Sequence, residues 1–508
     1  METVSAVATP RERRLLPALL RWHGRVGVVA CVGVLMWALS GVLHPVMSRM
    51  QPRAVTFALP SQVLDLRNAP PLAQVLQKFG VTRIDWFRVV ALPEGQYYQV
   101  ALPGQSELAY FTFTDGQRAP DMDRTYAEYL PRHYLGDQQS VIAETRRVSG
   151  FDSEYSYINR FLPAYRVAFT RDDAMRVYVD TATSRLGTLV DRPKSWFGAY
   201  FQSLHTWSFL DGAPRVRAVL MSLLLLAAFL TAMMGIWIYG FRFASLAKPA
   251  GLRRIHRTGA ILVSITTLTF TFSGAYHVLQ GVQPPMASPG LRAGGFDATE
   301  FKVPLTAVAA SLPTGVAVRA IAPAHIDGRT YYRIEIMPPM LANNDGHHAP
   351  PLPGASTIAL PPILIDAADG RILKDGEARY ARSLALAFSG LSDSAIRATG
   401  VISKFESEYG FVFKRLPVSR IEFAAPGRPR YYVDTSFGVL AARIDDSDAR
   451  EGWSFAYLHK FEWLAGFGTL TRDGIAMAFA LGNALVAIAG CVLFMRRRRG
   501  AGSGTRDG

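Results

Sequence analysis

The chain has very little cysteine and lacks the motifs of the common soluble enzymes. Only Cys31 and Cys491 occur among its 508 residues, and both fall inside long apolar windows. Disulfides therefore do not hold the rest of the chain together, and we interpret both thiols as small buried hydrophobic groups. The sequence contains no GxGxxG after a strand pattern, no GxxxxGK[ST], no HExxH and no GxSxG. It thus offers no machinery for dinucleotide binding, nucleotide binding or hydrolysis.

Acidic residues are fewer than basic ones, but the basic excess is confined to three short segments. The chain carries 55 Lys and Arg against 40 Asp and Glu, a net charge of +15. Segments 1–25, 242–257 and 496–508 hold five basic residues each and only three acidic residues together, so the rest is nearly neutral. Basic segments that alternate with long neutral stretches are typical of the positive-inside rule of membrane proteins. We therefore expect no nucleic-acid partner.

Four apolar windows lie beside these basic segments, and each is long enough to cross a lipid bilayer with few or no charges. The sequence predicts a multi-pass membrane protein with both termini in the cytoplasm and with the first span as a retained signal-anchor. The expected segments are a cytoplasmic N-terminus 1–25, span 26–47, outer region 50–213, span 216–241, cytoplasmic loop 242–257, span 259–280, outer region 283–472, span 474–495 and cytoplasmic tail 496–508.

The second half of the chain repeats the first. RWH…SGVLH at 21–44 returns as RIH…SGAYH at 254–277, an offset of 233. FDSEY and YVDT return as FESEY and YVDT at an offset of 254. The difference predicts an insertion in the second copy, and the Pro-, Asn- and Gly-rich stretch 338–361 is the natural place for it, as a mobile loop. We expect two copies, each span–outer region–span, related by a pseudo-two-fold axis along the membrane normal.

Both outer regions contain strand–turn–strand patterns. YFTFTDGQ, RVYVDTATSRLGTLV, PILIDAADGRILKDG and RYYVDTSFGVLAARI each place Tyr, Val, Ile or Thr around an Asp-, Gly- or Ser-rich turn, which is typical of a hairpin. Helical patterns occur at 71–79 and 303–312. The predicted fold is therefore an internally duplicated four-span α-helical bundle with two outer α+β regions, each made of two small α+β units.

Histidines recur at both ends of the first and third spans. His23 and His44 are 21 residues apart, which corresponds to about 31 Å of helix, close to the ~30 Å thickness of the hydrocarbon core. The two side chains differ by only about 60° around the helix and share a face. Imidazole is a common ligand of haem iron, and ionisable groups that face the interior of a membrane bundle are usually functional. The six repeated histidines, which we predict to ligate haem iron, are His23, His44, His205, His256, His277 and His459.

These six form two layers in the predicted topology. His23 and His256 share a depth near the cytoplasm, and the other four lie near the outer face. The outer pairing stays open: His44 with His277 is simplest by symmetry, and cross-pairing with His205 and His459 would allow a second outer haem. Because CxxCH is absent, we expect non-covalent haem b, with two groups in all. The alternative is that these histidines are amphipathic anchors at the membrane surface.

Other polar and aromatic residues have simpler interpretations. His133 and His325 are expected at the surface, and His347 and His348 in the inserted loop, where a labile metal contact is the alternative. Glu154 and Glu408 of F[DE]SEY either relay protons or touch a ferric ligand, or form structural ion pairs. Most tryptophans in or beside the spans are expected to be interfacial anchors, although one can flank a haem. They are Trp22, Trp37, Trp207, Trp237 and Trp463.

The paired spans, the YVDT hairpins and the segments LHTWSFL and LHKFEWL resemble the family of PepSY-associated transmembrane proteins, over nearly the whole chain. The hairpin turns depart from the family's YVDxxTG pattern, with Ser184-Arg185 in one copy and Phe437-Gly438 in the other. Members are bacterial inner-membrane proteins, and the better-understood ones look like haem-containing ferric-siderophore reductases.

The resemblance implies an oxidoreductase that reduces a ferric siderophore, or another ferric chelate, at the outer face and releases Fe(II). Its electrons would come from a quinol or a cytoplasmic reductase, and the chelate would dock above the outer haem, against Tyr155, Tyr409 or nearby arginines. The sequence identifies no catalytic residue. Two alternatives remain: a non-redox PepSY membrane protein that binds peptides or regulates a periplasmic partner, and a haem electron carrier with another acceptor.

Overall fold

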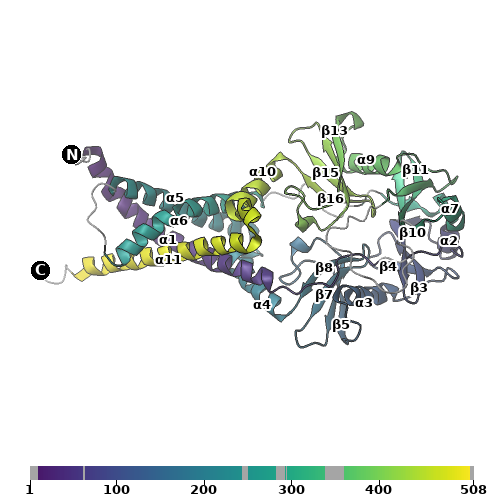
Figure 1. Ribbon diagram of the computed structural model, residues 1–508, viewed down its shortest axis with the longest axis horizontal. Helices are drawn as coiled ribbons and strands as arrows, with labels where there is room; N and C mark the ends of the chain where they lie inside the picture. The colour runs from purple at the N-terminus through teal and green to yellow at the C-terminus, as the bar shows by residue number, and fades with distance from the viewer. Residues whose placement is uncertain are drawn as a thin grey trace. The chain divides into compact units, whose positions relative to one another are not determined.

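The computed structural model describes residues 10–60, 63–242, 250–281, 292, 294–337 and 360–503 (Figure 1). The chain forms two compact units. One contains Met1–Gln51, Pro193–Pro285 and Ser447–Gly508, and the other contains Pro52–Arg192 and Met286–Asp446. Most of the predicted insertion, with His347 and His348, lies outside the described residues.

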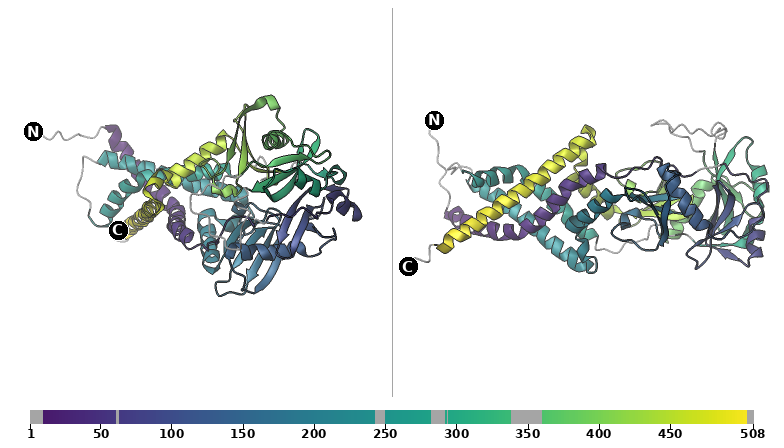
Figure 2. Two further views of the ribbon diagram at one scale, coloured as in Figure 1. Left: turned by 45° about the vertical axis from the view of Figure 1, so that its right-hand side comes forward. Right: turned by 90° about the horizontal axis from the view of Figure 1, so that it is seen from below.

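The first unit is built on four long apolar helices that can cross a membrane, as the sequence predicted. Each contacts two others: α1 packs on α5 and α11, and α6 packs on α5 and α11, so the four close into a ring (Figures 1 and 2). Only 17–28% of the most apolar window of each helix is buried. The remaining apolar surface suits a lipid bilayer, so the chain is a multi-pass membrane protein. The helices are α1 (Pro10–Arg49), α5 (Pro214–Arg242), α6 (Leu252–Gln280) and α11 (Thr469–Ser503).

Glycines allow α6 and α11 to approach closely. A Cβ on Gly259 would lie 2.8 Å from Val486, and one on Gly482 would lie 2.9 Å from Val263. Both distances are too short for any larger residue unless the neighbour moves. Small residues at such crossings are the usual way in which helices associate where lipid removes the hydrophobic driving force.

A short helix and a π-helical turn precede each of the second and fourth spans. α4 (Arg192–Phe201) continues into η2 (Gln202–Thr206), and α10 (Asp446–Ser454) continues into η7 (Phe455–His459). Each short helix carries an exposed tryptophan, Trp196 with 60% and Trp453 with 58% exposure, stacked on a tyrosine one turn later. Such aromatic pairs are typical of a membrane–water interface.

The second unit consists of small antiparallel sheets, each covered by a helix. Two have three strands and two have four, and a two-stranded pairing joins β1 (Arg83–Ile84) to β9 (Phe296–Asp297). The three-stranded sheets are β2 (Trp86–Leu92), β3 (Gly95–Ala101) and β4 (Leu108–Thr112), and β10 (Ala317–Ile326), β11 (Arg329–Met337) and β12 (Ile363–Asp366). The four-stranded sheets are β5 (Ile142–Val148), β6 (Ala164–Phe169), β7 (Arg176–Asp180) and β8 (Arg185–Val190), and β13 (Ile396–Ile402), β14 (Val418–Phe423), β15 (Arg430–Asp434) and β16 (Val439–Ile444).

Two of the four predicted hairpins are present, because their sequences alternate around turn-forming residues. In the other two, YFTFTDGQ and PILIDAADGRILKDG, the strand β4 or β12 is followed only by a single bridge, Phe111↔Arg118 or Ile365↔Ile372. β7 pairs with β8, and β15 pairs with β16, in the expected antiparallel registers. Ser184 and Gly438, at equivalent positions of the two turns, both have positive φ values of 56° and 62°. A glycine adopts this conformation without strain, and Ser184 is held in it by hydrogen bonds to Tyr126 and Arg88.

The two three-stranded sheets share one hydrophobic core, to which α2 (Leu72–Lys78) and α7 (Leu305–Ser311) contribute. Each four-stranded sheet shares a further core with one three-stranded sheet. The sheets β5–β8 and β2–β4 share the core around α3 (Met122–Leu135), and the sheets β13–β16 and β10–β12 share the core around α9 (Gly376–Ser389). Each outer region thus contains two small α+β units, and the helices predicted at 71–79 and 303–312 are α2 and α7.

Candidate functional site

Two histidines from different helices face each other in one layer of the helical bundle. His23 is on α1 and His256 is on α6, and their ring centroids are 6.2 Å apart with an angle of 58° between the ring planes. Nδ1 of His23 lies 3.1 Å from the carbonyl oxygen of Thr231 on α5, and Nδ1 of His256 lies 3.0 Å from that of Val486 on α11. All four helices therefore position this inner pair.

A second histidine pair lies beside Ser40 of α1. Ser40 follows His23 by 17 residues, which is about 25 Å along the helix at 1.5 Å per residue. His205 and His459 lie in the two π-helical turns, and their ring centroids are also 6.2 Å apart, with the planes at 87°. Nδ1 of His205 lies 2.9 Å from Oγ of Ser40 on α1, and Nδ1 of His459 lies 3.1 Å from Oγ of Ser273 on α6. Both serines are almost completely buried, with 0% and 1% exposure.

The hydrogen bonds fix which nitrogen of each ring carries the proton. A carbonyl oxygen only accepts, so Nδ1 of His23 and of His256 must donate. Ser40 Oγ donates to the carbonyl oxygens of Met36 and Trp37 and is left to accept from His205, and Ser273 bonds the Phe270 carbonyl in the same way. Among the described residues no hydrogen bond reaches Nε2 of these four rings. Each ring therefore presents an Nε2 lone pair, with its orientation fixed through Nδ1, as metal-binding histidines do.

The spacing of both pairs fits one metal ion between two imidazoles. A metal–imidazole bond is about 2.0 Å long and the nitrogen lies about 1.1 Å from its ring centre, so two opposed ligands have centroids about 6 Å apart. Within the described residues no group of three or more His, Cys, Asp or Glu side chains could hold a metal ion. Structural zinc needs four protein ligands, whereas haem iron takes four of its bonds from the porphyrin. Two opposed imidazoles therefore fit haem.

The outer pair is kept neutral by its surroundings. Burial, with smaller contributions from the nearby His44 and His277, lowers the pKa of His205 to about 4. Burial likewise lowers the pKa of His459 to about 3, helped by the charges of His205 and His277. Both imidazoles are unprotonated at neutral pH and hence available as ligands.

His44 and His277 lie beside the outer pair and do not face each other in a comparable pair. The His44 ring contacts Phe201 at 5.3 Å between centroids, and Phe201 stacks on His205 at 4.6 Å. In the other half, His277 stacks on Phe455 at 4.8 Å, and Phe455 stacks on His459 at 4.9 Å. Nδ1 of His277 also lies 2.7 Å from Glu451. A single phenylalanine thus separates each of these histidines from the nearest ring of the outer pair.

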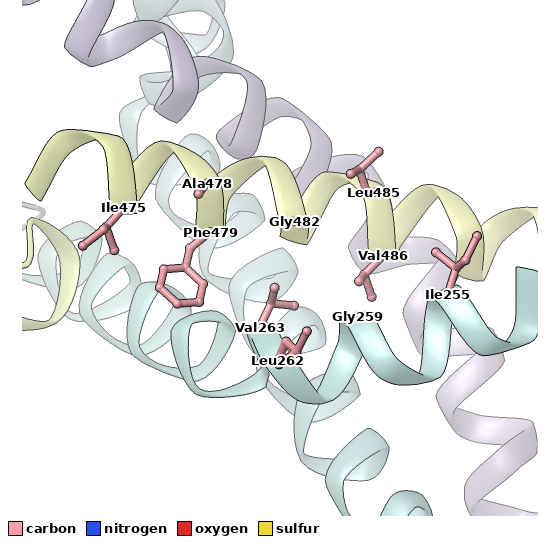
Figure 3. Close-up of a pocket in the computed structure, with 10 residues that line it drawn as sticks. All are labelled: Ile255, Gly259, Leu262, Val263, Ile475, Ala478, Phe479, Gly482, Leu485 and Val486. Carbon is pink, nitrogen blue, oxygen red and sulfur yellow. The ribbon is translucent and has the colours of Figure 1, made fainter. Parts of the chain in front are cut away.

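An apolar groove of about 440 Å³ runs between α6 and α11 beside the inner pair (Figure 3). Its side chains are aliphatic apart from Phe479, and two of its lining residues, Gly259 and Gly482, have no side chain. Leu262 and Leu485 on its rim are 69% and 54% exposed, as expected of surface in contact with acyl chains. The groove supplies no polar ligand, so the chemistry of this unit depends on the histidines.

The tryptophans near the spans divide into two groups. Trp37 and Trp207 stack on each other at 5.9 Å, and Trp37 Nε1 donates to the carbonyl oxygen of His205 at 3.2 Å, so this pair supports the outer site. The other three are 57–60% exposed, as interfacial anchors would be: Trp22, Trp237 and Trp463.

Glu154 and Glu408 form structural ion pairs, the second of the two predicted roles. Glu154 lies 2.8 Å from Arg176 and accepts a hydrogen bond from Tyr178. Glu408 lies 2.9 Å from Arg430 and accepts one from Tyr432. Both carboxylates are committed to neighbouring strands.

Tyr155 and Tyr409 cannot dock a chelate as the sequence suggested, because both have 0% exposure. Each hydroxyl donates to a backbone carbonyl oxygen, of Phe161 and Arg415 respectively. His133 hydrogen-bonds the carbonyl oxygen of Ala58, 75 residues earlier, and His325 lies within hydrogen-bond distance of the Thr330 hydroxyl.

Sequence reasoning missed the groups that hold the imidazoles. Ser40 and Ser273 stood out only as members of the repeat, and that repetition is the signal that could have identified them. The carbonyl oxygens of Thr231 and Val486 left no signal, because every residue has a carbonyl group. No family model matches the chain, and no curated protein matches it.

Proposed function

We propose that the protein binds two haem b groups and carries electrons across a bacterial inner membrane to reduce a ferric chelate, of the siderophore class, on the outer side. His23 and His256 would hold the inner haem, and His205 and His459 the outer one, with His44 and His277 beside it. The observation that carries the proposal is the recurrence, at two depths, of a 6.2 Å imidazole pair anchored through Nδ1. When bound, haem supplies a one-electron centre whose potential depends on its ligands and its burial.

The choice of acceptor rests on chemistry and on the resemblance to PepSY-associated proteins. Fe(III) is a hard ion that oxygen donors grip firmly, and Fe(II) is held more weakly, so one electron releases the metal and spares the chelator. A quinol or a cytoplasmic reductase would be the donor. We further propose that the two halves arose by duplication and that both outer regions are PepSY-like. The equivalent registers Tyr165↔Val179 and Ser419↔Val433, offset by 254, support this.

The first experiment measures haem in the purified protein and in alanine variants. The wild type should show the reduced-minus-oxidised bands of low-spin bis-histidine haem. His256→Ala should remove one part of the signal and His459→Ala another, while His133→Ala should leave it intact. Full haem retention in both ligand variants would contradict the assignment.

The second experiment tests the acceptor under anaerobic conditions. The haems are reduced chemically, a ferric siderophore is added, and reoxidation is followed together with trapping of Fe(II). Stoichiometric Fe(II) formation is expected. Haems that stay reduced with a panel of ferric chelates would favour an electron carrier with another acceptor, and a colourless protein without iron would favour a non-redox PepSY protein.

A further inference from the structure

Inside the second unit, arginine side chains from both halves of the chain lie around two aromatic rings. Trp86 on β2 contacts Phe437, in the turn between β15 and β16, at 5.6 Å between centroids. The Arg292 guanidinium carbon lies 4.6 Å from the Trp86 ring centre. That of Arg88 lies 5.9 Å from Trp86 and 5.8 Å from Phe437, and that of Arg185 lies 5.8 Å from Phe437. Three guanidinium groups thus surround one aromatic pair.

A fourth arginine joins this group through a shared carboxylate. Arg415, which is 7% exposed, lies 3.2 Å from Asp434 Oδ2, and Arg185 lies 3.6 Å from the same oxygen. The other nearby carboxylate belongs to Asp180, whose oxygens accept from the Ala182 amide and the Thr183 hydroxyl.

Arg88 and Arg292 have no carboxylate partner at ion-pair distance in the described part of the chain. Arg88 bonds Gln99 and the Thr181 carbonyl, and Arg292 bonds the Phe437 carbonyl at 3.2 Å. Of the four guanidinium groups, Arg185 and Arg415 thus share Asp434, while Arg88 and Arg292 have no described carboxylate at ion-pair distance. The pKa of Arg292 is lowered to about 10, mainly by burial; the charge of Asp180 opposes this shift and that of Arg415 adds to it. Uncompensated charge of this kind is destabilising unless a counter-ion neutralises it.

Two buried donors at the group lack acceptors among the described residues. Trp86 is 2% exposed and its Nε1 has no hydrogen-bond partner, and the same holds for Nε of Arg185. Buried N–H groups are nearly always paired, so each unpaired donor calls for an acceptor. Arg88, Arg185 and Arg292 are half-buried, with 12% exposure of the Arg185 side chain, so a small molecule would reach the group only past these side chains.

Arg185 and Arg415 do not correspond to each other, or to any other arginine, in the sequence repeat. At the offset of 254, Arg185 corresponds to Val439 and Arg415 corresponds to Phe161, whereas the two aspartates correspond to each other. Each half therefore contributes its own cations to one common place, as a site between two halves would require.

We propose that Arg88, Arg185, Arg292 and Trp86 form a binding site for a small oxyanion or carboxylate. The ligand would accept hydrogen bonds from the indole N–H, from Nε of Arg185 and from the guanidinium nitrogens of Arg88 and Arg292 that bind no described residue. Guanidinium N–H groups suit carboxylate and phosphate oxygens. This site is separate from the histidine pairs and does not depend on the proposed electron transfer.

The test uses the full chain in detergent, in Tris chloride buffer without carboxylates or other oxyanions, with inorganic phosphate as the probe. Isothermal titration should show saturable binding of one phosphate per chain, and phosphate should raise the unfolding midpoint. Trp86→Phe keeps an aromatic ring at this position and removes the indole N–H together with the rest of the pyrrole ring, so it should weaken phosphate binding about tenfold; the unfolding midpoint without phosphate shows whether the fold is kept. Arg292→Gln should weaken it by at least as much.

Arg379→Gln is the matched control, because Arg379 is exposed and paired with Asp327 in the same unit. It should bind phosphate like the wild type. A purely structural cation–π cluster predicts instead that Trp86→Phe is neutral. The proposal fails if the wild type shows no saturable phosphate binding, or if Trp86→Phe and Arg292→Gln bind as tightly as the wild type.

Discussion

Each inner histidine has a glycine beside it, and the two glycines differ in how much room they leave. A Cβ on Gly490 would lie 2.9 Å from Cε1 of His256, whereas one on Gly235 would lie 3.5 Å from Cε1 of His23. The first distance requires the imidazole to move, and the second is an ordinary contact. We expect Gly490→Ala to lower the haem content or shift the haem bands of the inner site, because ligands displaced by even 1 Å bind metal poorly.

Gly235→Ala is the matched control and should retain the wild-type spectrum. Haem per chain from the pyridine haemochrome assay, together with the reduced-minus-oxidised spectrum, gives the comparison. Equal spectra for the two variants would argue that the inner imidazoles are not held in the position described.

At the residue scale, the sequence allows the candidate histidines to be identified but not their pairing. The six histidines could be selected because they repeat at fixed offsets in an apolar context. Which outer rings face each other could not be deduced, because His205 and His459 lie on turns whose direction the spacing of residues does not determine. The π-helical geometry of those turns depends on one hydrogen-bond register, which a hydropathy pattern does not encode.

At the scale of the elements, Arg333 joins strand β11 to helix α9. Its side chain is 4% exposed and lies 2.7 Å from Glu335 and 2.9 Å from Glu377. Removal of the cation would leave two carboxylates without their charge partner, so Arg333→Met should lower the free energy of unfolding by about 3–5 kcal/mol. Urea unfolding followed by tryptophan fluorescence measures this. Arg382→Met breaks an exposed pair with Asp393 and should cost at most about 1 kcal/mol; similar losses for both would contradict the assigned role.

The same ion pairs predict a pH dependence of stability. Burial would raise the pKa of Glu335, but the neighbouring Arg333 outweighs it and holds that pKa at about 2, below the ordinary 4.5. A carboxyl whose folded pKa is lowered stabilises the fold fully above its unfolded pKa and loses this contribution as the pH falls. The contribution of Glu335 should therefore disappear between about pH 4.5 and pH 2. Glu335→Gln should flatten the acid limb of the stability profile, and an unchanged limb would count against this account.

Hairpins and short helices were the most predictable elements. YVDTATSRLGTLV alternates around a turn and became β7 and β8 because each apolar face could be buried against α3. The partners in the ion pairs and the arginine group were not predictable, because they are far apart in sequence. Arg333 and Glu377 are 44 residues apart, and no local pattern connects them.

At the scale of the whole molecule, the basic segments predict that both ends of the chain lie on the cytoplasmic side. The chain has only two cysteines, and both lie within helices of the bundle, so introduced cysteines can report sidedness. Glu94→Cys, in an exposed turn of the outer region, should react with a membrane-impermeant maleimide on intact spheroplasts. Ser503→Cys should react only after lysis. The opposite pattern would invert the topology and with it the side on which a chelate is reduced.

Because the four helices form a closed ring, the order in which the two halves follow each other in the chain matters little for the histidine pairs. α1 touches α11 just as α5 touches α6, so the bundle has no structural beginning, and the halves are connected between α5 and α6 only through residues 243–251. Each imidazole pair takes one ring from each half: His23 and His205 from the first, His256 and His459 from the second. If the two halves were made as separate polypeptides, neither would contain a complete histidine pair. Under the proposed function, the haem absorption would then appear only in cells that make both halves.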